Sequence, residues 1–435
     1  MQKEDNLKQN TVGYTVESGL CCGCGVCKAI CPTGCIAWEK RQGFFSPHID
    51  EERCVHCGSC AAVCPGLTHK YETRETALET VTGTVMNSYN AWTKDPQLRH
   101  VSASGGVVST LIRELLMSGS YDGVFCLDTY DYREQLKTQF YTIGEIKADD
   151  MLSRLPKSRY LPVSHENAVT YMKEHRDARL ILIGSSCAVR GLLAAVDRLK
   201  LDRAQYLLIG LFCDKVFNYN VLPYFEDTYA AGKSLLSLHF KNKESGGWPG
   251  DMKFFPQGGT PFYVPLSERS KAKDYFSLER CLYCVDKLNV CADISVGDNY
   301  TGKDSSELGS NSVIIRTPAG KKAWVMARDQ MEVRDVSIAD IQKGQALEWR
   351  LNNLQFGDAK MSKENVDLNQ GVPRNHAGGF AKEEWKIQLN KLQSGACYDT
   401  DPEKVKEERR KSSKQPNLVE RDVKRIARWI KRKLT

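Results

Sequence analysis

Ten of the seventeen cysteines lie within the first 64 residues, and eight of these ten form two copies of one spaced pattern. In each copy two residues separate the first cysteine from the second, and two separate the second from the third. Three residues separate the third cysteine from the fourth, and a proline follows the fourth. The two copies are Cys21, Cys24, Cys27 and Cys31, then Cys54, Cys57, Cys60 and Cys64. Such short spacings wrap three thiolates around one iron–sulfur cluster, while the fourth thiolate reaches the other cluster. The pattern therefore predicts two 4Fe–4S clusters.

The spacing also predicts which cysteines share a cluster. We expect one cluster on Cys21, Cys24, Cys27 and Cys64, and the other on Cys54, Cys57, Cys60 and Cys31, as in bacterial two-cluster ferredoxins. Structural zinc and disulfides are the alternatives, but zinc needs only two close pairs of ligands and gives no reason for a doubled run that ends in proline. His56 lies between two ligands, yet the thiolate count is complete without it. Cys22 and Cys35 are surplus, and we expect them to be small buried side chains.

The composition is that of a globular protein, with 435 residues, 41% of them hydrophobic and 26% charged. This length allows two or three domains. The segment Met1–Val12 is polar and has no apolar stretch typical of a secretion signal. The longest apolar runs, Leu180–Ile183 and Tyr206–Phe212, are too short to span a membrane. Cysteines committed to metal in a reducing cytoplasm therefore fit better than a secreted disulfide scaffold.

The basic charge of the chain is confined to its end. Residues 401–435 hold 13 Lys/Arg and 6 Asp/Glu, whereas the other 400 residues hold 48 of each sign. The body is therefore neutral, which argues against a nucleic-acid partner. Residues 400–418 are charged and polar, and we expect a flexible linker there.

The last residues combine apolar and basic positions at helical spacing. The apolar positions are Val419, Val423, Ile426, Ile430 and Leu434. We expect a basic amphipathic helix over residues 419–435. One interpretation places this helix on an anionic bilayer at the inner face of the membrane, with Trp429 at the interface. The other is a helix docked on the protein's own body, or a solvated end.

The middle of the chain alternates helix and strand signals, as α/β proteins do. Residues 102–106 (SASGG) precede an expected helix, Val107–Met117, which Gly119 ends. A strand is expected over Tyr121–Leu127. Ser and Gly ahead of a helix leave unpaired N–H groups that suit an anion, although many helices begin this way without a ligand.

Two apolar runs are each followed by a cysteine. Cys187 follows Leu180–Gly184, and Cys213 follows Leu207–Phe212. Such runs are typical of buried parallel strands. Sites in parallel sheets form beyond the carboxyl ends of strands, so the two cysteines would lie side by side if the strands are neighbours. The alternative is that each is a lone buried cysteine.

A third cysteine group follows at Cys281 and Cys284, with Cys291 further on. A Cys-x₂-Cys turn presents two thiolates to one metal and needs two more ligands. We therefore predict a third 4Fe–4S cluster on Cys187, Cys213, Cys281 and Cys284, because thiolate-only ligation suits iron–sulfur clusters. Cys291 is the reserve ligand.

No Gly-x-Gly-x-x-Gly run follows a strand and no Walker-type loop is present, so no dinucleotide fingerprint marks an NAD(P)H site. Four other segments carry a resemblance. They are Ser102–Val124, Gly184–Val189, Leu208–Cys213 and Cys281–Asp298. In this order, with the ferredoxin unit ahead of them, they resemble the beta subunits of coenzyme F-420 hydrogenases and dehydrogenases, a flavin-dependent family that includes 7-hydroxymethyl chlorophyll a reductase. The resemblance covers roughly residues 13–300.

The resemblance implies FAD, a cluster beside it, and two-electron oxidation or reduction of a small organic molecule. It implies flavin contacts at Ser104, Gly105 and Gly106, and it gives Cys187, Cys213, Cys281 and Cys284 as the family's cluster ligands. The chain departs from the family at residues 185–188 (SSCA), where the family usually has Thr-Pro-Cys-Gln. The departure keeps the ligand but changes the wall around it. Asp298 follows an expected strand and could face the site, although a Gly-Asp turn is the simpler interpretation.

We therefore expect an α+β ferredoxin-like domain, then an α/β flavin- and iron–sulfur-binding domain, then a basic helical tail. The expected parts are residues 13–70 (ferredoxin), 71–84 (connector), 85–335 (flavin and iron–sulfur), 336–400 (an extension outside the family) and 401–435 (linker and basic helix). The expected function is an iron–sulfur flavoprotein oxidoreductase. It passes electrons from ferredoxin or a similar donor through the clusters to FAD and a small substrate, or in reverse with a deazaflavin. The alternative is an electron-transfer protein that feeds a separate enzyme.

Overall fold

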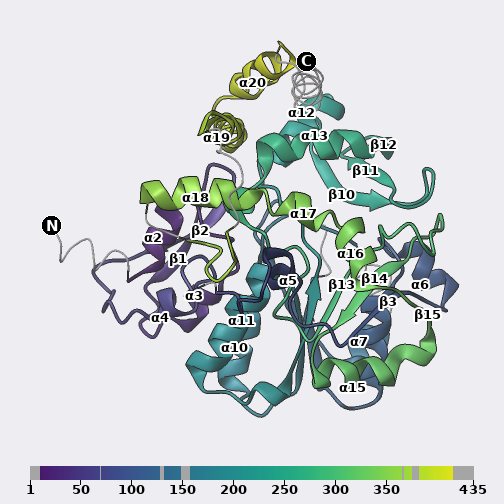
Figure 1. Cartoon of the computed structure of the whole chain (residues 1–435). Coiled ribbons are helices and arrows are strands. Elements are labelled where there is room, and N and C mark those ends of the chain that lie inside the picture. Colours follow the sequence, from purple (N-terminus) through teal and green to yellow (C-terminus); the bar gives the residue numbers. More distant parts are fainter. Residues whose placement is uncertain are drawn as a thin grey trace, which may run out of the picture.

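An eight-stranded mixed sheet forms the centre of the molecule (Figure 1). The computed structural model describes residues 10–68, 70–127, 132–147, 157–364, 367–374 and 382–414. The strands lie in the order β15-β3-β14-β13-β9-β8-β4-β6. Their bounds are β3 Asn87–Thr93, β4 Gly123–Cys126, β6 Gln139–Tyr141, β8 Leu180–Gly184, β9 Tyr206–Leu211, β13 Ile294–Asp298, β14 Asn311–Ile315 and β15 Met331–Asp335. The central strands β4, β8, β9 and β13 are parallel, and the outer pairs are antiparallel.

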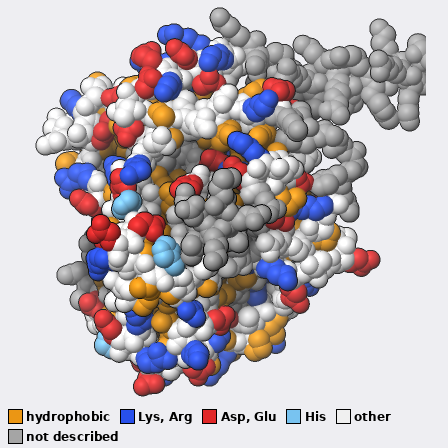
Figure 2. Space-filling model, turned by 90° about the vertical axis from the view of Figure 1, so that its left-hand side faces the viewer, with side chains coloured by type: hydrophobic (Ala, Val, Ile, Leu, Met, Phe, Trp, Pro, Cys, Tyr) orange, Lys and Arg blue, Asp and Glu red, His pale blue; other side chains and the backbone are white. Residues whose placement is uncertain are grey.

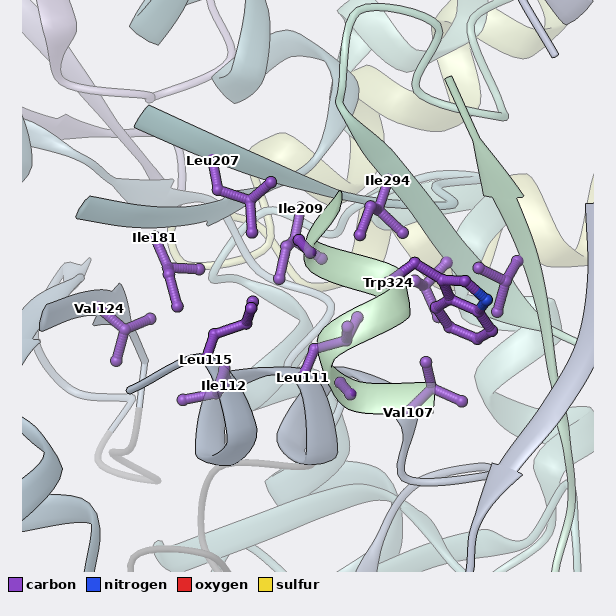
Figure 3. Packing of buried hydrophobic residues seen from close by; sticks show 14 of the residues in the cluster. Val107, Leu111, Ile112, Leu115, Val124, Ile181, Leu207, Ile209, Ile294 and Trp324 are labelled. Atoms are coloured by element: carbon purple, nitrogen blue, oxygen red, sulfur yellow. The ribbon is translucent and has the colours of Figure 1, made fainter. Parts of the chain in front are cut away.

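The central strands are apolar along most of their length because helices cover both faces of the sheet. One face carries α7 (Val107–Met117) and α15 (Pro318–Ala327). Figure 3 shows side chains of α7, among them Leu111 and Leu115, pointing at the β-branched residues of β8 and β9. Trp324 of α15 is buried in the same cluster and stacks on Tyr89, with the ring centroids 5.4 Å apart. The helix predicted over Val107–Met117 is present with the same bounds.

The other face of the sheet carries α10 (Glu166–Glu174) and α11 (Ser186–Leu199). The N-terminal unit packs on these two helices and shares their hydrophobic core. Val26 and Val63 of this unit lie in one buried cluster with Leu192 of α11 and Leu182 of β8. The elements of the unit are α2 Val12–Glu17, α3 Val26–Ile30, β1 Ile36–Arg41, β2 Phe44–Ile49 and α4 Ser59–Ala62. The cysteine-rich unit is therefore part of the main body, and its position relative to the sheet is set by apolar packing.

A second, smaller sheet lies above the carboxyl ends of the central strands (Figure 1). It is antiparallel, in the order β10-β11-β12, and α12 and α13 pack on it. The bounds are α12 Val221–Tyr229, β10 Leu235–Asn242, β11 Asp251–Pro256, β12 Phe262–Val264 and α13 Leu266–Phe276. Its core is largely aromatic, with Phe217, Phe225, Phe240 and Phe254 buried together. This sheet roofs the space beyond the central strands, and no sequence signal separated it from the rest of residues 85–335.

The C-terminal helices wrap back over the molecule and do not form a separate unit. Their bounds are α16 Ile338–Gly344, α17 Leu347–Arg350, α18 Asn353–Glu364, α19 Lys382–Ala396 and α20 Glu403–Lys414. The segment expected to be a flexible linker forms α20, so that expectation is wrong over these residues. Val405 of α20 is 1% exposed, and Arg409 donates a hydrogen bond to Tyr224 at 2.6 Å. The packing of α20 on the aromatic core stabilises a helix here in spite of the polar composition of the segment. The amphipathic helix expected over residues 419–435 lies outside the described residues.

The remaining elements are short. They are α5 Ala77–Thr82, α6 Pro96–Val101, β5 Leu136–Lys137, α8 Ile143–Lys147, β7 Val163–Ser164, η1 Arg203–Gln205, α14 Glu279–Tyr283 and η2 Arg328–Gln330. Helix α5 lies within the expected connector, where Thr76 and Glu79 form a reciprocal capping box. Within the part of the chain that the structure describes, no helix combines the length and the apolar character that a bilayer crossing requires.

Candidate functional site

The N-terminal unit gathers its cysteines around two small cavities. Cys21, Cys24, Cys27 and Cys64 line one of them, which we call the inner set. Cys54, Cys57, Cys60 and Cys31 line the other, the outer set. In both, the fourth cysteine of one copy meets the first three of the other copy. Gly25 has a left-handed φ of 78° at the start of α3, and a Cβ there would lie 2.1 Å from the Ser164 hydroxyl. Only glycine therefore allows this turn to pack against the large domain.

The two sets differ in their contact with solvent. Cys57 of the outer set is exposed, and hydrogen bonding to Ser59 lowers the pKa of its thiol. Cys27 of the inner set is 8% exposed, and burial raises its pKa well above the usual value. Figure 2 looks onto the side of the molecule that carries this unit, where acidic and basic side chains are interspersed. The outer set is therefore the one that an external redox partner can approach.

The surplus residues of the unit lie next to the ligand sets. His56 is exposed, with Nδ1 3.9 Å from the Cys54 sulfur and Nε2 3.7 Å from a Glu51 carboxylate oxygen. Cys35 is buried behind the outer set, with its sulfur 3.5 Å from that of Cys31. The placement of Cys35 agrees with the small buried thiol expected from the sequence, and His56 lies at the surface beside the outer set.

A third set of thiols lies beyond the carboxyl ends of β8 and β9. These strands are parallel neighbours, with Gly184 opposite Gly210, so their ends are level. Cys187 lies in the first turn of α11, directly after β8, and Cys213 follows β9. Cys281 lies on α14 and Cys284 ends this helix. The topology therefore brings together, from three separate segments, the four cysteines expected to bind a third cluster.

The thiols of this third set interact electrostatically with one another. Burial, followed by repulsion from Cys281, Cys187 and Cys284, raises the pKa of Cys213 well above its usual value. Burial raises the pKa of Cys281 to about 11, with Cys284 and Cys187 adding to the increase. Four half-buried thiols that resist ionisation together are a fitting donor set for a cationic iron cluster, which binds them as thiolates. Cys291 lies instead among Arg190, Asp286 and Arg316.

Cys22 joins the inner set to the third set. Its side chain is 8% exposed and hydrogen-bonds with both Cys24 and Cys187. The hydrogen bond with Cys22, followed by burial, raises the pKa of Cys187 well above its usual value. A small buried side chain was expected here from the sequence, and burial agrees with that. Its place between the two sets was not foreseen, because no spacing rule connects residue 22 to residue 187.

A buried arginine lies between the same two sets. Arg280, next to Cys281, is 2% exposed and donates to the carbonyls of Leu20 and Pro65, both at 2.9 Å. Burial opposes its charge, but attraction to Cys22, Cys187, Cys284 and Cys64 in their ionised form outweighs burial and raises the pKa of Arg280. The side chain thus anchors α14 of the large domain to the N-terminal unit and places a positive charge between the two thiol sets.

A cavity of about 360 Å³ opens next to the third set. Its walls are the carboxyl ends of the central strands, the start of α7 and the segment 157–165. Cys22, Cys187 and Cys213 contribute to the wall, so the third set borders this space. Position and size are those of a cofactor site in an α/β sheet.

The start of α7 places two of the three expected flavin contacts on this wall. Ser104 and Gly106 line the cavity, whereas Gly105 is not among the lining residues. A Cβ on Gly105 would lie 2.8 Å from the carbonyl oxygen of Ala91, so close packing against β3 accounts for this glycine. The Lys243 ammonium holds the turn by donating to the Ser104 carbonyl at 3.0 Å.

Asp298 ends β13 and lines the cavity, so the Gly-Asp turn considered from the sequence is wrong. Its carboxylate accepts two hydrogen bonds from the Lys241 ammonium, at 2.6 and 2.8 Å. Burial opposes ionisation of this carboxyl group, but Lys241 outweighs it and lowers the pKa. Asp298 is therefore an ionised hydrogen-bond acceptor at neutral pH and not a proton donor.

His165 also lines the cavity, although nothing in the sequence singled it out. It is 2% exposed, its backbone N–H donates to the Cys24 carbonyl at 2.7 Å, and burial lowers its pKa to about 4. Its Nδ1 has no hydrogen-bond partner among the described residues. A histidine after a two-residue strand carries no motif, so only the fold reveals its place.

Family comparisons match most of the chain. Residues 88–168 match "Coenzyme F420 hydrogenase/dehydrogenase, beta subunit N-term", and residues 177–340 match the C terminus of the same subunit. Residues 20–66 match "4Fe-4S dicluster domain".

Two curated proteins of methanogens are similar over long stretches. A subunit of the F(420)H(2) dehydrogenase of Methanosarcina mazei is 24% identical over 332 residues, which cover 74% of this chain and 87% of that protein. Coenzyme F420-dependent sulfite reductase of Methanocaldococcus jannaschii is 24% identical over 411 residues, 90% of this chain but 58% of that protein.

A chain of the F420-reducing [NiFe] hydrogenase complex of Methanosarcina barkeri aligns with a TM-score of 0.49 and 20% identity, over 67% of this chain and 98% of its own length. The matched relatives are F420-linked oxidoreductases or their electron-transfer subunits. The doubled cysteine pattern coincides with the dicluster match, and the cysteines of the third set fall within the C-terminal match. The chain is an iron–sulfur electron-transfer protein, and it belongs to the family of coenzyme F420 hydrogenase/dehydrogenase beta subunits, with a 4Fe–4S dicluster domain fused ahead of the family's own domains.

Proposed function

We propose that the chain is an oxidoreductase that carries electrons from a ferredoxin-like donor through three 4Fe–4S clusters to FAD in the large cavity, and on to a small organic substrate. The reverse direction, with a deazaflavin as electron donor, uses the same arrangement. One observation carries this proposal. The outer set, the inner set, Cys22 and the third set follow one another from the exposed Cys57 to the cavity wall.

The donor sets support three clusters. Each of the two ferredoxin sets lines one small cavity with four thiols, and the third set presents four interacting thiols. Thiolate-only ligation of this kind is the chemistry of 4Fe–4S clusters. The outer set, with the exposed Cys57, is the entry point for a donor, and the third set on the cavity wall is the exit toward the cavity.

The cavity suits a flavin nucleotide or a deazaflavin, both of which carry a ring system and phosphate. Lys157, Arg159 and Lys215 lie on the wall and provide positive charge for phosphate. The unpartnered Nδ1 of His165 is available to a ring heteroatom. FAD bound there converts between one-electron and two-electron transfer. The protein's part is to hold the ring near the third set and to keep Asp298 ionised.

The relatives bear on the choice of substrate. Two proteins named for F420 align with this chain over 74% and 90% of its length. A deazaflavin is therefore, together with FAD, one of the two small molecules to test first as a ligand of the cavity. The chain spans only 58% of the sulfite reductase, so reduction of sulfite does not transfer with the similarity.

Metal and flavin analysis of anaerobically purified protein tests this proposal. We expect about twelve irons and one flavin per chain, because three cubes hold four irons each. We also expect the flavin absorbance to bleach with reduced ferredoxin or reduced deazaflavin. About eight irons without flavin would contradict the proposal. Zinc in place of iron would contradict it more completely.

An electron-transfer protein that serves a separate enzyme is the second candidate, because one relative is named as a subunit of a dehydrogenase. Such a carrier needs the clusters but no substrate in the cavity. Reoxidation of the bleached flavin separates the two. Recovery on adding a small molecule to the isolated chain supports the oxidoreductase, and recovery only with a partner protein supports the carrier.

A further inference from the structure

The C-terminal extension contacts the helix that carries half of the third set. The family match ends at residue 340, and α17, α18 and the segment after α18 lie beyond it. Asn353 donates a hydrogen bond to the carbonyl of Cys284 at 3.0 Å, and Asn369 donates one to the carbonyl of Tyr283 at 2.8 Å. Lys360 pairs with Glu279 at 3.0 Å. The two asparagines, which lie outside the family match, therefore hold the backbone at the end of α14.

One residue of this extension binds Asp214, the neighbour of Cys213, and acts electrostatically on the thiols. Arg350, the last residue of α17, is 2% exposed. Its Nη1 donates to the Asp214 carboxylate at 3.1 Å, and its Nη2 donates to the Asp214 carbonyl at 2.7 Å. Its charge acts on Cys213, Cys281 and Cys284, three of the four thiols.

The Nε–H of Arg350 is buried and has no hydrogen-bond partner among the residues that the structure describes. A buried guanidinium N–H without a partner is costly, so a ligand that accepts its hydrogen bond is to be expected. Besides Asp214, the groups that act on the charge of Arg350 are the thiols of Cys284, Cys281 and Cys213. Sulfides and thiolates of a cluster accept hydrogen bonds from such donors.

Asp214 does not cancel the charge of Arg350. This carboxylate also pairs with Lys273 at 2.7 Å, and Lys287 lies close enough to act on its pKa. One carboxylate thus faces Arg350, Lys273 and Lys287, so the charge around Asp214, next to Cys213, is positive on balance. Reduction adds a negative charge to a cluster, so a buried positive charge stabilises the reduced state more than the oxidised state.

We propose that Arg350 is a positioning residue for the third cluster, and that its charge and its free Nε–H raise the reduction potential of that cluster. The proposal rests on the function proposed above. The reaction concerned is transfer of one electron, in which the cluster on the inner set is oxidised and the third cluster is reduced, with a ferredoxin-like donor as the source. The C-terminal extension therefore sets the driving force of the last step before the cavity.

Redox titration followed by EPR tests this assignment in the full-length, cluster-loaded protein. Three variants are compared with the unchanged protein. They are Arg350→Gln, which removes the charge, Arg350→Lys, which keeps it, and Lys360→Met, which removes another buried cation that the same extension places against α14. The signal that is lost in Cys281→Ser identifies the third cluster.

We expect Arg350→Gln to lower the ratio of reduced to oxidised third cluster at least tenfold at a fixed solution potential, which corresponds to about 59 mV for one electron. Arg350→Lys should recover most of this shift, and Lys360→Met should leave the potential unchanged. An unchanged potential in Arg350→Gln would overturn the proposal, as would an equal shift in Lys360→Met. Arg350→Gln could lose the third cluster altogether. In that case an iron content equal to that of the unchanged protein in Arg350→Lys and Lys360→Met supports the proposal. A loss of iron in Lys360→Met equal to that in Arg350→Gln overturns it. Eight irons in the unchanged protein would instead refute the proposed function.

Discussion

The N-terminal unit and the large domain collect cysteines in opposite ways. The unit takes all eight cysteines of its two sets from 44 consecutive positions, between Cys21 and Cys64. The third set takes Cys187, Cys213, Cys281 and Cys284 from the ends of two strands and from one short helix. The first arrangement is encoded in local spacing, and the second exists only once β8 and β9 are paired. Local motifs therefore build the exposed end of the proposed electron path, and tertiary structure builds the end at the cavity.

The two regions also differ in the charges that surround them. Cys57 of the outer set is exposed to solvent, which screens its charge. The third set is enclosed by Arg280 and Arg350, both 2% exposed. Buried charges act over longer distances than exposed ones because the surrounding dielectric constant is low. Electrostatic tuning by side chains is therefore expected to be strong at the third set and weak at the outer set.

Removing one ligand from each region gives the largest expected effect. Cys213→Ser should remove about four of about twelve irons and abolish electron transfer into the cavity, while both ferredoxin clusters remain. Cys57→Ser should instead remove or convert the outer cluster and leave the third set intact. Iron analysis with EPR measures both. If Cys213→Ser also emptied the N-terminal unit, the two regions would not be independent.

The sequence was sufficient to predict the two cysteine sets of the N-terminal unit and part of the third set. The crossed sharing of Cys31 and Cys64 follows from spacing alone, and the structure brings these residues together in that way. The strands ahead of Cys187 and Cys213 were predicted from apolar runs, because parallel strands are buried on both faces. Their adjacency stayed conditional, since a sequence does not state strand order.

The residues that were missed act through long-range contacts. Cys22 and His165 have no motif, and each is important only because the N-terminal unit docks on α10 and α11. Gly105 packs closely against β3, and its expected contact with a flavin stays a prediction. Arg350 belongs to a segment outside the family resemblance, and nothing in its local sequence points to Asp214, 136 positions away. Contacts of this kind are properties of the folded chain.

Arg280 connects the N-terminal unit to the large domain, so its removal tests how much this connection contributes to the stability of the fold. Arg280→Met leaves the buried carbonyls of Leu20 and Pro65 without a donor. We expect a loss of about 4 kcal/mol in the free energy of unfolding, since each unsatisfied buried group costs roughly 1–3 kcal/mol and charged donors lie at the upper end. Thermal unfolding measures this loss. Arg53→Met, which removes one exposed hydrogen bond to Thr33, should change stability by less than about 0.5 kcal/mol.

The pair of Lys241 and Asp298 tests charge compensation at the cavity wall. In the unchanged protein Lys241 lowers the pKa of Asp298, so the pair stabilises the fold above the unfolded pKa, and this contribution is lost as the pH falls through the folded pKa. Lys241→Met leaves burial as the dominant influence and raises this pKa above its unfolded value.

The sign of the pH dependence therefore reverses in Lys241→Met. Its stability should fall by roughly 3 kcal/mol as the pH rises from about 4 to neutrality, because the buried carboxylate then has no counter-ion. Unfolding measured at both pH values checks this, with Lys241→Arg as the control that keeps the charge. An equal pH dependence in the two variants would contradict the compensation.

The smallest effects concern α20, the helix that replaces the expected linker. Val405→Ala removes two buried carbon atoms from the aromatic core and should cost about 2 kcal/mol. Lys406→Ala removes an exposed ion pair with Glu403 on the same helix and should cost only about 0.3 kcal/mol. If both substitutions changed the unfolding free energy equally little, α20 would not be docked in solution. A larger loss of unfolding free energy in Val405→Ala would show that tertiary packing holds the end of the extension in place. Local composition does not reveal this packing, just as it does not reveal the packing that brings the third set together.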